Sequence, residues 1–171
     1  SMPKLATSVG IDFGIKTFAT LSNSGSIFNP RTLFVYEHKL KQEQRKLSKK
    51  QKGSKNNEKQ RLKLAKIHNK VANIREDFLQ KETTKIIKEN QIINIEKLSV
   101  KMMMTSKEYK NIAKELANVS INKAIQMLKY KADWYKRTLV EIGEYYPSSQ
   151  LCHCCGYQNK ELKLSDREWI C

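Results

Sequence analysis

The first thirty residues alternate between apolar and polar positions with the period of two that is typical of β-strands. Apolar side chains occupy every second position from Val9 to Phe13, and a second apolar run covers 18–21. The turn-forming residues 23–25 separate this run from a third one at 26–28. The pattern therefore predicts that the chain opens with two or three short strands that form a β-meander.

A helical period replaces this alternation in the next sixty residues. We expect one helix from about Tyr36 to Lys52, an interruption at Gly53 and the residues after it, and a second helix from about Glu58 to Glu89. Apolar residues of the second helix are spaced by four, three and four positions, which predicts a buried seam. The seam consists of Ile67, Val71, Ile74 and Phe78. Together the two helices form a predicted helical hairpin.

Two strands and one helix account for most of the remaining chain. The apolar run 91–95 predicts a buried strand that ends at Glu96, and 138–142 predicts another. Between them we expect a helix from Asn111 to about Tyr135, one face of which carries Leu116, Val119, Ala124 and Leu128. Three strands, a long helical insertion, a strand, a helix and a last strand predict an α/β fold with a mixed sheet flanked by helices.

The length of 171 residues is that of one folded domain. No apolar run approaches the roughly 18 residues of a membrane span, and no charged-then-apolar leader is present. We therefore expect a soluble, cytoplasmic protein with no membrane partner.

Positive charge is concentrated in the predicted hairpin. The chain has a formal charge of +16, and residues 39–70 alone carry 13 Lys or Arg against two Glu, whereas 71–90 are balanced. A Lys-rich helix face is usually only solvated, but a net +11 over 32 residues repels itself and favours a polyanion as partner. The predicted nucleic-acid-binding residues are Arg45, Lys46, Lys49, Lys50, Lys52, Lys55, Arg61, Lys63 and Lys66.

Two carboxylates occupy predicted strands. Asp12 lies between Gly10 and Gly14 in an apolar strand, and Glu96 ends another strand. Acids that two strands deliver to one sheet edge can hold Mg (or Mn) ions, which activate water for phosphodiester hydrolysis. Taken alone, each acid is explained as well by a structural role as by metal binding: it could cap a turn or be an ordinary charged residue at the end of a strand. Asp-x-Gly after a first strand also occurs in actin-like ATPases, but the basic hairpin favours a nuclease.

All four cysteines lie in the last twenty residues. Cys152 and Cys155 are followed after 15 residues by Cys171, which is three-quarters of a zinc-ribbon spacing. We expect the fourth thiolate just after the end of this sequence. His153 and Cys154 are interpreted as bystanders that could supply a substitute ligand, and the alternative is a set of reduced, unliganded cysteines. For the aromatic-rich segment 130–135, a packing role is the default expectation.

These motifs, in this order, resemble the TnpB/OrfB family of insertion-sequence proteins, which are related to type V CRISPR effectors. Residues 10–16 are similar to the first RuvC motif of that family, 95–101 to the second, and Arg45 to Asn56 to the basic hairpin between them. The segment from Pro147 to Cys171 is similar to the ribbon that precedes the third motif. The resemblance covers nearly the whole chain.

The resemblance implies an RNase H-like (RuvC) fold and RNA-guided, Mg-dependent cleavage of DNA. It implies a nuclease domain at 3–147 with the hairpin inserted at 36–90, and a partial zinc ribbon at 148–171. It also implies catalytic, metal-binding roles for Asp12 and Glu96, zinc at the cysteines, and DNA and guide RNA as partners.

The chain departs from the family pattern at several positions. The third motif with its catalytic Asp is missing and the second cysteine pair is incomplete, so we expect a truncated nuclease that binds nucleic acid weakly and is inactive alone. Lys97 and the methionines at 102–103 are departures that we expect to be tolerated. The alternative is a non-catalytic nucleic-acid-binding relative. The incomplete sheet also favours a homodimer or a domain swap.

Overall fold

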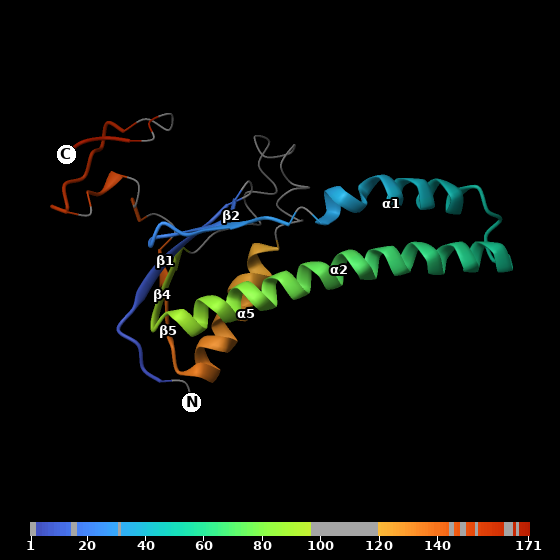
Figure 1. Ribbon diagram of the computed structural model, residues 1–171. Coiled ribbons are helices and arrows are strands. Elements are labelled where there is room, and N and C mark those ends of the chain that lie inside the picture. Colours follow the sequence, from blue (N-terminus) through green and yellow to red (C-terminus); the bar gives the residue numbers. More distant parts are fainter. Residues whose placement is uncertain are drawn as a thin grey trace.

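A computed structural model shows how these elements are arranged (Figure 1). The structure describes residues 3–14, 17–30, 32–96, 120–143, 146–147, 150–152, 154–162, 166 and 168–171. The helix residues expected before Ser120, including Leu116 and Val119, and the positions Lys97, Met102, Met103 and His153 lie outside the described residues. Ser120 itself is not helical, in contrast to the expectation, because it is the N-cap with a left-handed backbone.

Five strands form one mixed sheet with the order β3-β2-β1-β4-β5. The neighbours β1–β2 and β2–β3 are antiparallel, whereas β1–β4 and β4–β5 are parallel. Antiparallel neighbours need only tight turns, but parallel neighbours need long crossovers, which the helices supply. The predicted strands and the mixed α/β fold are confirmed. The strands are β1 (Ser8–Phe13), β2 (Thr17–Leu21), β3 (Ser26–Phe28), β4 (Ile92–Glu96) and β5 (Thr138–Ile142).

One face of the sheet forms the hydrophobic core. Val9 and Ile11 of β1 lie opposite Ile93 and Ile95 of β4, and all four side chains are buried. Helices α2 (Lys55–Glu89) and α5 (Ile121–Tyr135) cover this face and bury apolar side chains in the same core. Side chains alternate between the faces of a strand, so the residues between these apolar positions lie on the opposite face.

The predicted hairpin is confirmed, with shifted ends. Its first helix is α1 (Thr32–Ser48), which begins and ends four residues earlier than expected. The Ser48 hydroxyl donates to the carbonyl oxygen of Arg45 at 2.9 Å, and a turn follows directly. Gly53 has a φ of +78°, and Ser54 caps α2 by accepting a hydrogen bond from the Asn57 amide. In Figure 1 the hairpin extends away from the sheet, and the C-terminal segment lies beyond the sheet's other end.

The predicted seam of α2 is partly wrong. Val71 is buried and Phe78 packs against the core, but Ile74 is 36% exposed, and the buried stripe continues through Leu79, Ile86 and Ile87. The reason is that α2 changes partner along its length: it first packs against α1 and then against the sheet and α5. On α5, the predicted face with Ala124 and Leu128 is confirmed, since both side chains are fully buried.

Among the helices that the structure describes, none is both long enough and apolar enough to cross a membrane.

Candidate active site

Asp12 and Glu96 lie side by side on the sheet face that α2 and α5 leave uncovered. The parallel register pairs Ile11 of β1 with Ile95 of β4, and each acid follows directly after its member of that pair. Paired positions of neighbouring strands present their side chains on the same face. Both acids line one open cavity of about 440 Å³. The structure therefore brings together the two acids that the sequence placed on separate strands.

Neutral polar residues form much of the remaining wall of this cavity. Thr20 pairs with Asp12 across β1 and β2, and Ser22 lies beside Gly10, whose amide donates to the Ser22 hydroxyl oxygen at 2.9 Å. Asn94, two positions before Glu96, donates from Nδ2 to the carbonyl oxygen of Val9 at 3.3 Å. Because that carbonyl can only accept, the contact orients the Asn94 amide.

Sequence reasoning missed these three wall residues. The period-two pattern of the strand could have identified Asn94, since it places this residue on the same face as Glu96. Thr20 and Ser22 depend on the register between β1 and β2, for which the sequence carries no direct signal.

The two glycines around Asp12 serve different purposes. Gly10 lines the cavity, where the lack of a side chain leaves room for a ligand to come close. At Gly14 a Cβ atom would come within 2.8 Å of the Thr17 carbonyl oxygen, so the glycine allows the close approach of β2. Gly14 therefore has a structural role and is not part of the cavity lining.

Electrostatics at the pair favour a bound cation. Partial desolvation raises the pKa of Asp12 above its ordinary value of 3.8, and the negative charge of nearby Glu96 raises it further. Although the Asp12 side chain is exposed, the cavity walls exclude part of the water around its carboxylate. A divalent cation between the two carboxylates would offset their repulsion, and carboxylate oxygens are the ligands that Mg²⁺ and Mn²⁺ prefer.

A second candidate site is the cysteine cluster. The sulfur atoms of Cys152, Cys155 and Cys171 all lie within 4.8 Å of one another, so these three residues can hold a metal ion. A tight turn positions the first two: the amide of Gly156, which has a φ of +73°, donates to the Cys152 carbonyl oxygen at 2.9 Å. Cys154 is exposed and is not part of the cluster. Within the described residues the cluster has three ligands.

The three thiols share protons unequally. Backbone hydrogen bonds from Cys155 and Cys154, followed by hydrogen bonds from the thiols of Cys171 and Cys155, lower the pKa of Cys152 to about 6. Hydrogen bonds to Cys152 and Cys155 and the negative charge of these two groups raise the pKa of Cys171 to about 11. Cys152 is thus the thiol of the three that ionises most readily, and a metal ion would displace the remaining protons.

The basic hairpin is the third candidate site. Its nine predicted contact residues are all exposed, on α1, on the turn and on the first part of α2. Glu43, one of the few acids here, accepts hydrogen bonds at 2.6 Å from Lys46 and from Gln60, and these two contacts lower its pKa. The positive charge of the other eight residues therefore faces solvent with little local compensation.

Two family models match this chain. Residues 2–107 match the OrfB_IS605 family, described as a probable transposase, and residues 122–171 match the TNB domain of Cas12f1-like proteins. These matches favour the nuclease interpretation over the actin-like ATPase.

Similar curated proteins are named as RNA-guided DNA endonucleases. One from Streptomyces pristinaespiralis is 38% identical over 99% of this chain and 41% of its own length. InsQ of Escherichia coli is 35% identical over 97% of this chain and 44% of its own length, and a Mycobacterium tuberculosis protein is 28% identical over 95% and 37%. This chain thus spans less than half the length of these relatives. Since the family match covers more than half of the chain, the chain belongs to the OrfB_IS605 transposase family, with an RNase H-like α/β fold.

Proposed function

We propose that this chain carries the catalytic centre of an RNA-guided DNA endonuclease that hydrolyses phosphodiester bonds. The observation that carries the proposal is the shared cavity of Asp12 and Glu96, on adjacent strands of an RNase H-like sheet. The names of the relatives supply the substrate, DNA, and the guide, RNA.

The two carboxylates would hold Mg²⁺ or Mn²⁺ in the cavity. Such an ion lowers the pKa of a bound water and stabilises the leaving oxygen of the phosphodiester. Asp12 and Glu96 would fix the ion at the edge where β1 and β4 end, and Thr20 and Asn94 would border the space left for the substrate. Two acids hold a two-metal site poorly, so we expect this chain by itself to cleave slowly or not at all.

The hairpin and the cysteines would support this centre. The exposed lysines and arginines of 36–90 would bind the phosphates of the guide–target duplex without reading its sequence. Cys152, Cys155 and Cys171 would bind Zn²⁺, the ion that thiolate-rich sites of this spacing prefer. In this proposal residues 3–147 form the nuclease domain and 148–171 a partial zinc ribbon. The expected homodimer or domain swap stays a prediction that the comparisons do not support.

Nicking of supercoiled plasmid in the presence of Mn²⁺ tests the proposal, both for this chain and for a version extended to the length of its relatives. We expect Asp12→Asn and Glu96→Gln each to lower the nicking rate of the extended version at least a hundredfold. Glu161→Gln, which removes an exposed carboxylate outside the cavity, is the matched control. If the cavity variants nick as fast as this control, the assignment of Asp12 and Glu96 as catalytic residues is wrong. If the extended version shows no Mn²⁺-dependent nicking at all, the chain is the non-catalytic relative instead.

A further inference from the structure

We propose that a groove across the C-terminal half of α2, together with the aromatic pair Tyr130 and Trp134 of α5, binds an unpaired segment of nucleic acid. This surface lies on the helical layer, whereas the Asp12–Glu96 cavity opens on the other face of the sheet. The inference concerns binding alone, so it stands or falls independently of cleavage.

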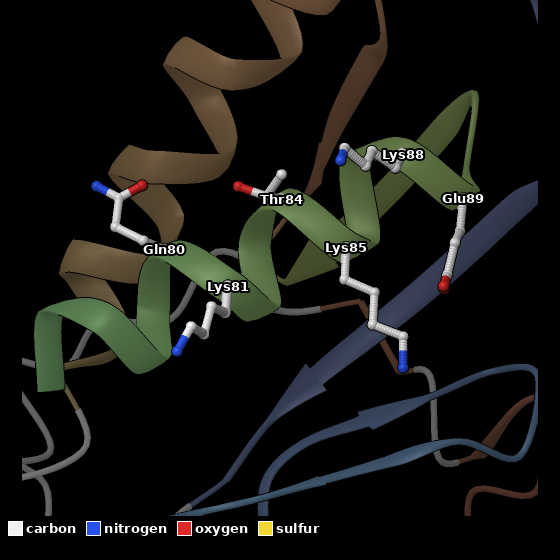
Figure 2. Close-up of a pocket in the computed structure, with 6 residues that line it drawn as sticks. All are labelled: Gln80, Lys81, Thr84, Lys85, Lys88 and Glu89. Carbon is white, nitrogen blue, oxygen red and sulfur yellow. The ribbon is translucent and has the colours of Figure 1, made fainter. Parts of the chain in front are cut away.

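The groove has a volume of about 410 Å³ and is lined by side chains of α2, which include three lysines and one glutamate. Figure 2 shows its lining side chains on two sides of α2. On the side toward α5 they are Gln80, Thr84 and Lys88, and on the other side Lys81, Lys85 and Glu89. Lys81 forms an ion pair with Asp77 at 2.6 Å. Lys85 and Lys88 are therefore the cations best placed to meet an anionic ligand.

The aromatic pair lies next to this groove. The packing role expected for residues 130–135 is confirmed for Tyr130 and Tyr135, but it is wrong for Trp134, which is 70% exposed. Its ring is 4.7 Å from that of Tyr130, measured between centroids, and the Tyr130 hydroxyl is hydrogen-bonded to the side-chain amide of Gln80 at 3.2 Å. Gln80 thus belongs to the groove wall and also holds the aromatic pair. A supported, exposed indole offers a flat face on which a base can stack.

Buried contacts fix α5 against this part of α2. The Lys131 ammonium donates to the hydroxyl oxygens of Thr83 at 2.7 Å and Thr84 at 2.8 Å. Just after the end of α5, Nε of Arg137 donates to the Ile87 carbonyl oxygen at 3.1 Å. These contacts fasten α5 to the part of α2 that carries the lysines, so the helix that presents Trp134 is held in place beside them.

Lysines beside an exposed aromatic face match single-stranded nucleic acid. Phosphates would contact Lys85 and Lys88, while an unpaired base would stack on Trp134. A duplex would supply phosphates for the lysines but no base for the indole, because the base faces of a duplex are already stacked on one another. An apolar protein partner would cover the indole but would offer no negative charge to the lysines.

Tryptophan fluorescence provides a local test, because the chain has only two tryptophans, Trp134 and Trp169. In a Trp169→Phe variant we expect ten-residue oligo(dT) or oligo(rU) to quench the emission of Trp134, and the tighter of the two to identify the natural strand. A duplex of equal length is expected to leave the emission unchanged.

Affinity measurements complete the test. We expect Trp134→Ala to weaken single-strand binding about tenfold. Lys85→Gln with Lys88→Gln should lower the slope of log affinity against log salt by about 1.4, since two phosphate contacts are lost. Lys4→Gln, at an exposed lysine elsewhere, is the control, and unchanged circular dichroism shows that the variants fold. Binding without quenching of Trp134, equal quenching by duplex, or full affinity of Trp134→Ala would each overturn the proposal.

Discussion

Asp12 is a residue whose placement costs stability when no cation is present. Its raised pKa means that folding disfavours the ionised carboxylate, so the cost is present at neutral pH and disappears below pH 3.8, where the side chain is protonated in both states. We expect Asp12→Asn to raise the melting temperature of the metal-free protein at pH 7 by about 1–2 °C. This corresponds to about 0.5 kcal/mol, a small value because the side chain is exposed.

Calorimetry at two pH values, with and without Mn²⁺, checks this prediction. The gain of Asp12→Asn should vanish at pH 3.5, and Mn²⁺ at pH 7 should stabilise the wild type more than the variant. Asp77→Asn removes an exposed, ion-paired carboxylate and should show neither effect. If the metal-free wild type is instead more stable than Asp12→Asn at pH 7, the inferred cost of the ionised Asp12 beside Glu96 is contradicted.

Lys131 is a charged residue that the structure places in the interior. Its ammonium contacts two threonine hydroxyls and the Gln80 carbonyl oxygen of α2. We expect Lys131→Met, which keeps the length of the side chain, to lower the free energy of unfolding by about 1–3 kcal/mol because the hydrogen bonds to a charged group are lost. Urea unfolding measures the change. Lys129→Met, at an exposed position of the same helix, should change it by less than about 0.5 kcal/mol.

At the scale of elements, the basic hairpin carries the clearest prediction. Replacing Lys46, Lys49, Lys50 and Lys52 by Gln should lower the slope of log affinity against log salt for duplex DNA by about 3–4, since each lysine neutralises one phosphate. Fluorescence anisotropy at several salt concentrations measures the slope. The control replaces four exposed lysines outside the hairpin and so has the same net charge: Lys4, Lys123, Lys129 and Lys160. If the two variants give equal slopes, the overall charge of the protein determines DNA binding, and the hairpin does not.

The elements could be predicted because their patterns are local. The alternation of apolar and polar residues predicted β1, and the bounds predicted for β5 are those of the structure at both ends. Features that depend on distant contacts could not be predicted. Ile74 repeats the helical period of α2, yet it is exposed because α2 changes partner near this point. Buried Lys131 and Arg137 find their acceptors on α2, about fifty residues away.

The same distinction holds for the candidate site. The order of the strands brings Asp12 and Glu96 together, and an acid at or near the end of each of two apolar strands was a sufficient signal for that pairing. Asn94 was predictable in principle from its position on the strand, but Thr20 required the register of β1 and β2. The exposure of Trp134 had no sequence signal, since an aromatic residue at helical spacing is usually buried.

At the scale of the whole molecule, the cysteine cluster is separate from the hydrophobic core. The core residues that the structure describes, with the side chains packed against them, lie between Val9 and Leu139, whereas the cluster lies in the last twenty residues. Metal binding at the cluster should therefore order the C-terminal segment without supporting the sheet. Trp169, whose ring lies 6.3 Å from that of Tyr157, is a natural reporter of that segment.

We expect the purified chain to bind one Zn²⁺ or Co²⁺ ion per molecule, with thiolate-to-Co²⁺ absorption, and to release it on acidification, because protons compete with the metal for the thiolates. Chelation should change Trp169 emission in a Trp134→Phe variant but leave the helical circular dichroism intact. Cys152→Ser should weaken binding at least tenfold, whereas Cys154→Ser should not, because that side chain is exposed outside the cluster. If both variants lose the same metal affinity, Cys154 is also a ligand. If chelation lowers the helical circular dichroism, metal binding at the cluster stabilises the core as well.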